Sequence, residues 1–277
     1  MTSTMTPTWD LPHTHRTPQG DVRWAAFGDG PPVVLLHGTP FSSLIWSDVG
    51  RALARTHRVY VWDMPGFGRS EQRAGQDVSL ATQAGIFAGL LEHWGLAAPD
   101  VVAHDVGGTV ALRATLLHGA TYRHLALVDA VSVGDWGTGF FTVLRDAPET
   151  FGRLPASAHE ALVASHTRSA SHRGLSEATL DALLAPWRGP QGQAAYYRQY
   201  AQALQSSTDE IQDLLADLTV PVTILWGRED TWLPPHLAEL LQSRIPHATL
   251  TWLEDAGHLS PLDAPAQLLA HLLPQLA

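Results

Sequence analysis

The stretch VVAHDVGGTVALR, residues 101–113, joins an apolar run to a helical pattern through one acidic residue, Asp105. The apolar run is typical of a buried strand, and the spacing after it is typical of a helix. A strand, a sharp turn and a helix form the context of a nucleophile elbow, in which the nucleophile stands between small residues such as Ala103 and Gly107. An isolated Asp before a helix is more often an N-cap, so other motifs must decide between the two roles.

Short apolar runs alternate with helical patterns along most of the chain. We expect strands at 21–27, 31–37, 58–63, 100–104, 124–129, 220–227 and 248–254. Apolar strands that alternate with helices indicate an α/β fold, with a mainly parallel, doubly wound sheet.

Residues 131–216 interrupt this alternation, because they contain several helical patterns and no convincing strand. We interpret them as a helical cap inserted after the strand expected at 124–129, which is the sixth strand when an additional N-terminal strand is counted, over the edge of the sheet where α/β folds bind ligands. The core then consists of residues 21–130 and 217–277. Residues 1–20, rich in Thr, Pro and His, are expected to be a loosely ordered N-terminal segment.

Composition narrows the classes of partner. The formal net charge of −10 disfavours nucleic acid, and the absence of Cys excludes disulfides and thiolate chemistry. No apolar stretch approaches the roughly 20 residues that span a bilayer, so we expect no membrane partner and a cytoplasmic location. The oligomeric state stays open.

Two further motifs follow Asp105 in an informative order. Asp230 comes just after the run VPVTILWG, and His258 lies in a loop after the next expected strand. Along the chain the nucleophile comes first, then the acid, then the histidine, and this order is typical of catalytic triads built on α/β sheets. Upstream, HGTP at 37–40 follows another apolar run, where Thr39 could supply a backbone N–H to an oxyanion.

These motifs and their spacing resemble those of α/β-hydrolases from Asp21 to the C-terminus. With an Asp at the elbow, the chain resembles the branch of that family that contains haloalkane dehalogenases, fluoroacetate dehalogenases and epoxide hydrolases. HGTPFSSLIW and DMPGFGRS also resemble loops of the dehalogenases. The resemblance implies an α/β-hydrolase fold and a catalytic role for Asp105, His258 and Asp230. Some dehalogenases take their acid from the end of the sixth strand, which makes Asp129 the alternative acid.

A carboxylate nucleophile favours displacement at a saturated carbon, because attack there yields an ordinary ester. Asp105 needs no general base, since an unperturbed Asp has a pKa of about 3.9. We therefore expect Asp105 to form an alkyl-enzyme ester, which water activated by His258 then hydrolyses. The backbone N–H groups of Thr39 and Val106 would hold the oxyanion of the second step.

The leaving group is less well defined by the sequence. Haloalkane dehalogenases typically carry Trp and Asn where this chain has Val106 and Thr39, which slightly favours an epoxide over an organohalide. Tyr197 and Tyr200, in the cap pattern AYYRQY, could protonate an opening epoxide or contact a halide. Trp136 and Trp232 could line the pocket, donate to a halide or belong to the core.

Three alternatives remain beside an epoxide hydrolase. They are a dehalogenase with atypical halide donors, an esterase-like hydrolase, and a non-catalytic binding protein with a lidded pocket. The 15 His residues show no ligand spacing on a helix, so we expect neither a metal nor a cofactor. A small apolar organic molecule and water are the expected partners of the site.

Overall fold

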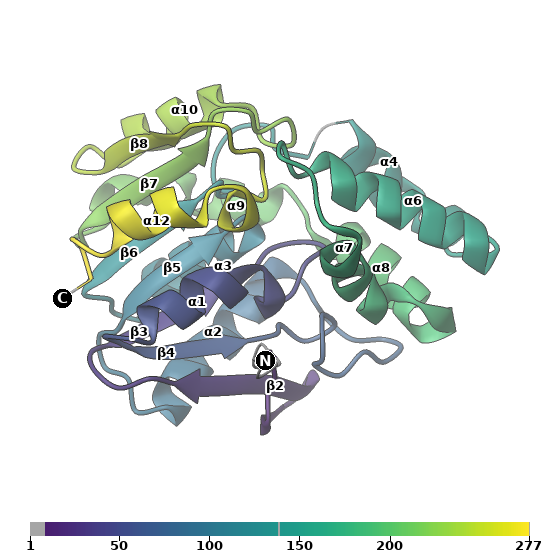
Figure 1. Ribbon diagram of the computed structural model, residues 1–277, viewed down its shortest axis with the longest axis horizontal. Helices are drawn as coiled ribbons and strands as arrows, with labels where there is room; N and C mark the ends of the chain where they lie inside the picture. Colours follow the sequence, from purple (N-terminus) through teal and green to yellow (C-terminus); the bar gives the residue numbers. More distant parts are fainter. Residues whose placement is uncertain (1–8, 138, 277) are drawn as a thin grey trace, which may run out of the picture.

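The computed structural model describes residues 9–137 and 139–276, which form one eight-stranded sheet with helices on both faces (Figure 1). The strand order is β1-β2-β4-β3-β5-β6-β7-β8. Pairs β1–β2 and β2–β4 are antiparallel, and the other neighbours are parallel, which confirms the predicted α/β class. The strands are β1 His13–Thr17, β2 Gly20–Phe27, β3 Pro32–Leu36, β4 Arg58–Trp62, β5 Asp100–His104, β6 His124–Val128, β7 Val222–Gly227 and β8 Thr249–Leu253.

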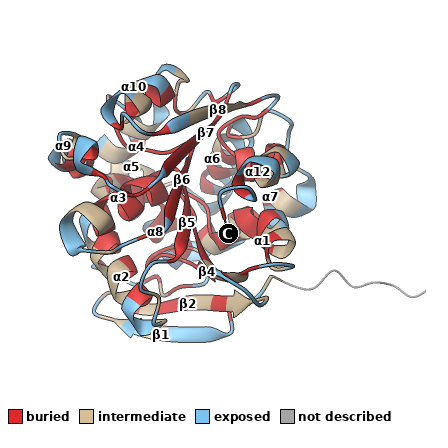
Figure 2. Cartoon of the chain, turned by 90° about the vertical axis from the view of Figure 1, so that its left-hand side faces the viewer, coloured by how far each residue is buried: buried red, intermediate tan, exposed pale blue. Residues whose placement is uncertain are grey.

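The central strands are apolar because both of their faces are covered. Every residue of β5, β6 and β7 is buried, whereas the edge strand β8 is buried only at Leu253 (Figure 2). Parallel strands covered on both sides require nearly continuous apolar sequence, as seen in VVA at 101–103 and ILW at 224–226.

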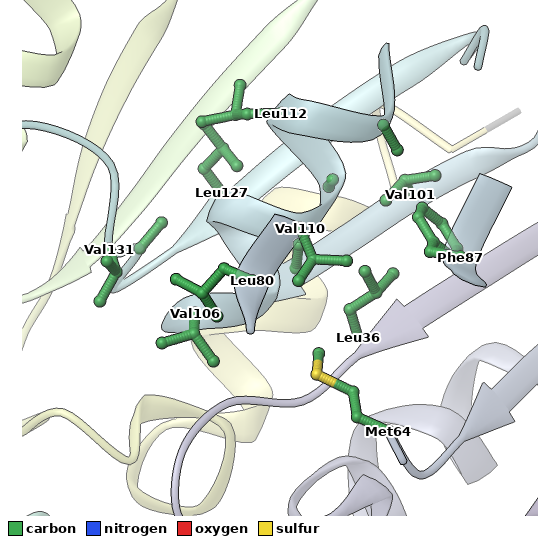
Figure 3. Packing of buried hydrophobic residues seen from close by; sticks show 14 of the residues in the cluster. Leu36, Met64, Leu80, Phe87, Val101, Val106, Val110, Leu112, Leu127 and Val131 are labelled. Carbon is green, nitrogen blue, oxygen red and sulfur yellow. The ribbon is translucent and has the colours of Figure 1, made fainter. Parts of the chain in front are cut away.

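Two helical layers enclose the sheet. Helices α1 (Ser47–Leu53), α11 (Ser260–Asp263) and α12 (Pro265–Leu272) lie on one face. Helices α2 (Leu80–His93), α3 (Val106–His118) and α10 (His236–Arg244) lie on the other. Figure 3 shows the second layer, where Val110 of α3 belongs to the same apolar cluster as Leu36 and Phe87. The 3-10 helices are Ser43–Trp46, Ala185–Trp187 and Leu215–Asp217.

A group of helices after β6 forms a cap beside the carboxyl ends of the strands (Figure 1). It contains α4 Phe140–Asp146, α5 Pro148–Phe151, α6 Ala156–Ser169, α7 Glu177–Leu184 and α8 Gly189–Gln202. Among the described residues of 131–216 there is no strand.

Helix α9 (Ser206–Gln212) falls inside the predicted cap but packs on the core. Arg113 of α3 donates to the backbone oxygen of Ser207 over 2.6 Å and pairs with Glu210 over 2.8 Å. The cap helices therefore end with α8, before the boundary at 216 expected from the sequence.

The N-terminal segment is more ordered than we expected. Residues 13–17, placed in a loosely ordered lead-in, form β1 and pair with β2 in register, His13 opposite Trp24. The polar sequence HTHRT suits an edge strand, because only one side of it contacts the sheet. Residues 1–8 lie outside the described residues.

Within residues 9–137 and 139–276, no helix is both long and apolar enough to cross a bilayer.

Candidate active site

Asp105 stands on a strained turn between β5 and α3, with φ 52° and ψ −128°. Non-glycine residues seldom adopt such a conformation, and those that do cluster at functional sites. Space for the turn depends on small neighbours: a Cβ on Gly107 would lie 2.6 Å from the carbonyl oxygen of His37. Asp105 occupies the N-cap position of α3, but its side chain makes no capping hydrogen bond to the helix.

Backbone N–H groups hold the Asp105 carboxylate. Thr39 N–H donates to Oδ2 over 2.6 Å, and the nearby backbone N–H groups of Thr39 and Val106 both act to lower the pKa of the carboxyl. The Thr39 loop is itself held by His37, whose Nε2 accepts the N–H of Met64 over 3.0 Å. The Thr39 N–H is thus aimed at Oδ2, an oxygen that could carry the oxyanion during ester hydrolysis, and Val106 follows Asp105 directly at the start of α3.

His258 lies between two carboxylates. Its Nδ1 is 2.9 Å from Asp230 Oδ2, and its Nε2 is 3.6 Å from Asp105 Oδ1. The other oxygen of Asp230 accepts the N–H groups of Trp232 and Leu233 over 2.8 and 2.9 Å. Asp230 is therefore a fixed acceptor that directs Nε2 of the imidazole toward Asp105.

Asp129, the alternative acid, has other partners. Its Oδ1 accepts the N–H of Gly227 over 2.6 Å, and its Oδ2 accepts the Ser260 hydroxyl. Burial and the nearby charge of Asp230 raise the pKa of Asp129 well above its ordinary value. The carboxylate that hydrogen-bonds His258 is that of Asp230.

The ionisation of Asp105 and His258 follows from burial and mutual charge. Burial raises the pKa of Asp105 to about 6, although the charge of His258 opposes the shift. Burial also lowers the pKa of His258, but Asp230 and Asp105 outweigh it and raise that pKa to about 9. At a pH between these two pKa values, Asp105 is a carboxylate and His258 is an imidazolium, and each charge stabilises the other.

A cavity of about 300 Å³ opens above Asp105 and His258 between core and cap. This volume is at the lower end for small-molecule sites. Its walls are mainly aromatic, and no Lys or Arg of the described chain lines it. Besides His258, the rings that line it belong to Trp136, Phe140, Phe141, His166, Tyr200 and Trp232.

The cap tyrosines face different ways. Tyr200 lines the cavity, and its hydroxyl lies 3.0 Å from Nε2 of His166 and 3.4 Å from the Tyr196 hydroxyl. Tyr197, expected beside it in the site, does not line the cavity, because its hydroxyl binds His159 Nδ1 over 2.9 Å inside the cap. Tyr197 is therefore not a cavity residue as we expected, because α8 directs its side chain into the cap.

Both tryptophans of the cavity have their indole N–H groups occupied. Trp136 donates to Thr208 Oγ1 over 2.8 Å, and Trp232 donates to Ser169 Oγ over 3.0 Å. Trp136 thus lines the site as expected, but as an apolar wall.

His166 was missed by sequence reasoning. It lies on α6 and reaches the cavity only through the packing of α6 on α8, which no motif signals. Burial, with a smaller contribution from the charge of His258, lowers the pKa of His166 to about 3. The described residues contain no group of three or more His, Cys, Asp or Glu that could hold a metal ion.

Comparison with known proteins defines the family. The model of the alpha/beta hydrolase fold family matches residues 31–265. The chain belongs to the alpha/beta hydrolase family. This α/β-hydrolase is 39% identical to an alpha/beta hydrolase fold protein from Burkholderia ambifaria of known crystal structure. The superposition of the two structures has a TM-score of 0.93 and covers 96% of this chain and 98% of that chain.

Curated relatives of this α/β-hydrolase catalyse different reactions. Pimeloyl-[acyl-carrier protein] methyl ester esterase of Aeromonas salmonicida (strain A449) is 28% identical and covers 88% of this chain and 94% of its own. Haloalkane dehalogenase 2 of Mycobacterium bovis is 25% identical and covers 92% of this chain and 91% of its own. These similarities support a hydrolase, but they do not identify the reaction, which has to be inferred from the chemistry of the site.

Proposed function

We propose that this α/β-hydrolase opens epoxides, with Asp105 as the nucleophile and an alkyl-enzyme ester as the intermediate. The proposal depends first on the position of Asp105. A carboxylate occupies the elbow where a serine hydrolase would carry a hydroxyl, and the resulting ester would lie against the N–H groups of Thr39 and Val106.

The Tyr200–His166 pair is the single observation that carries the choice of an epoxide. Opening an epoxide releases an alkoxide on the substrate, which requires a hydrogen-bond donor or acid on the side away from the nucleophile. Tyr200 lines the same cavity as Asp105, and its hydroxyl lies 3.0 Å from His166 Nε2. When His166 donates to the Tyr200 oxygen, the phenolic proton is free to point to the substrate.

A halide would need different donors. In this cavity the indole N–H groups of Trp136 and Trp232 are bound to Thr208 and Ser169. The N–H of Thr39 is bound to Asp105, and the N–H of Val106 lies beside the same carboxylate. A departing halide would therefore compete for donors that already have partners, whereas an epoxide oxygen would meet Tyr200.

The two steps conserve protons. Asp105 attacks one epoxide carbon, the C–O bond breaks, and the oxygen gains the proton that His258 loses when its charged partner becomes an ester. Neutral His258 then removes a proton from water, which attacks the Asp105 carboxyl carbon. The water oxygen remains in the regenerated carboxylate, one of its protons enters the diol, and the other returns His258 to the imidazolium form.

Trapping of the ester tests this proposal. His258→Gln blocks the second step, and in this variant the opened oxygen takes its proton from solvent, so the enzyme should still accumulate one covalent adduct on Asp105. We would compare styrene oxide with (2-bromoethyl)benzene, two compounds with the same carbon skeleton. An adduct with the full mass of styrene oxide, and little from the bromide, supports epoxide opening.

The remaining outcomes discriminate the alternatives. An adduct only from the bromide would assign a dehalogenase, and turnover of simple esters without any alkyl adduct would assign an esterase. No adduct and no turnover across a broad panel would favour a binding protein. Asp105→Ala in the same background should remove any adduct that is truly on Asp105.

A further inference from the structure

Trp232 contacts both imidazoles of the site. Its indole stacks on His166 with ring centroids 4.1 Å apart and planes 7° from parallel. It also stacks on His258, with centroids 5.0 Å apart and planes at 23°. The same indole is thus shared by the imidazole beside Asp105 and the imidazole beside Tyr200.

Trp232 is held at both ends. Its backbone N–H donates to Asp230 Oδ1 over 2.8 Å, the same carboxylate that binds His258. Its indole N–H donates to Ser169 at the end of cap helix α6 over 3.0 Å. A side chain fixed to the core at one end and to the cap at the other cannot easily change its angle to His258.

We propose that Trp232 is a positioning residue that stabilises the imidazolium form of His258 through the face of its indole. An aromatic face attracts a cation within about 6 Å of its centroid, and Trp is the strongest of the aromatic residues in this respect. His258 becomes cationic when it takes a proton from water, so the contact strengthens during ester hydrolysis. The effect of Trp232 on ester hydrolysis rests on the proposed function, whereas its effect on the charge of His258 does not.

Other groups also act on the charge of His258. Asp230 and Asp105 contact it, Asp129 contributes at longer range, and the His104 ring lies 4.9 Å from it. His104 Nε2 also hydrogen-bonds the backbone oxygen of His258 over 2.7 Å. All of these groups remain when Trp232 is replaced, so a change in the pKa of His258 would report on the indole.

The test is an NMR titration of His258 in the free enzyme, assigned by comparison with His258→Gln. Trp232→Leu removes the aromatic face, Trp232→Phe retains an aromatic ring, and Trp136→Leu removes an indole from the same cavity that does not stack on His258. We expect the pKa of His258 to fall by about half a unit to one unit in Trp232→Leu. It should change less in Trp232→Phe and stay unchanged in Trp136→Leu.

An unchanged pKa in Trp232→Leu, or an equal fall in Trp136→Leu, would overturn the proposal. If Trp232→Leu does not fold, Trp232→Met provides a longer apolar side chain without an aromatic face for the same comparison.

A rapid-quench experiment with styrene oxide supplies the catalytic readout. The alkyl-enzyme should accumulate more in Trp232→Leu than in the wild type, because its hydrolysis slows about 3- to 10-fold. If the wild type forms no alkyl-enzyme, the proposed function fails while the titration still decides the role of Trp232. If the ester forms and its hydrolysis is not slowed, the role of Trp232 in catalysis is overturned and the epoxide reaction stands.

Discussion

The core side and the cap side of the cavity differ in charge, and His258 and His166 illustrate the difference. His258 is buried, His166 is partly buried, and both stack on Trp232. Burial lowers the pKa of His166 to about 3, whereas carboxylates on both sides of His258 raise its pKa to about 9. Burial therefore makes the cap side neutral, and only direct carboxylate partners keep the core side ionised.

This division suits the proposed reaction. The charged core side supplies the nucleophile and the base, and the neutral cap side supplies hydrogen bonds to an oxygen that becomes negative. A cation in the cap would pair with Asp105 and weaken its attack, which a neutral Tyr200–His166 pair avoids.

The largest expected effect is at the nucleophile. Asp105→Asn keeps the size of the side chain but removes the attacking oxygen anion, so diol formation should fall on the order of 10⁵-fold. The measurement is steady-state hydrolysis of styrene oxide, with circular dichroism to check the fold. Activity within tenfold of the wild type would rule out Asp105 as the nucleophile.

The two buried acids form a matched pair for the next prediction. Asp230→Asn removes the charge that supports His258 and should reduce turnover about 10³- to 10⁴-fold. Asp129→Asn keeps an acceptor for Gly227 and should have a much smaller effect. Steady-state kinetics of both variants on one substrate gives the comparison, and the reverse order would assign the role to Asp129.

Variants of Tyr200 and Tyr197 compare the cavity with the interior of the cap. Tyr200→Phe should slow epoxide opening about 10²-fold, because the alkoxide loses its donor. Tyr197→Phe removes a hydroxyl that binds His159 inside the cap and should leave opening nearly unchanged. Single-turnover kinetics measures this step directly, and equal losses would contradict the division into cavity and interior.

The rate of attack should fall in acid. Asp105 has a pKa of about 6, so ester formation should drop roughly tenfold per pH unit below that value as the carboxylate is protonated. His166, with a pKa of about 3, should not titrate in this range. The pH profile of kcat/KM checks the prediction. If kcat/KM falls only near the ordinary pKa of Asp, the Asp105 carboxylate is more hydrated than the structure indicates, and the prediction is wrong.

The smallest effect is on stability. Because the folded-state pKa of Asp105 is about 6 and its ordinary value is 3.8, the protonated form favours folding. That stability is present below pH 3.8 and is lost as pH rises through about 6. Asp105→Asn should therefore be more stable than the wild type at pH 8 by about 1–3 kcal/mol, and by less at pH 4. Urea unfolding at both pH values measures this difference.

The sequence predicts the core side of the site much better than the cap side. Asp105, Asp230 and His258 each follow an apolar strand, and the strands of a parallel sheet end at one edge. Their order along the chain therefore places them together. In the cap, Tyr197 and Tyr200 lie on one helix only three residues apart, and the rotation of α8 decides which of them meets the cavity.

The sequence by itself determined the alternation of strands and helices and the turn that carries Asp105, because both depend on local periodicity and on small residues beside one strained position. Only the tertiary structure decided that His166 meets Tyr200, that Trp232 stacks on both imidazoles, and that Asp230 binds His258. Those contacts join residues far apart in the chain through side-chain packing, which has no period along the sequence.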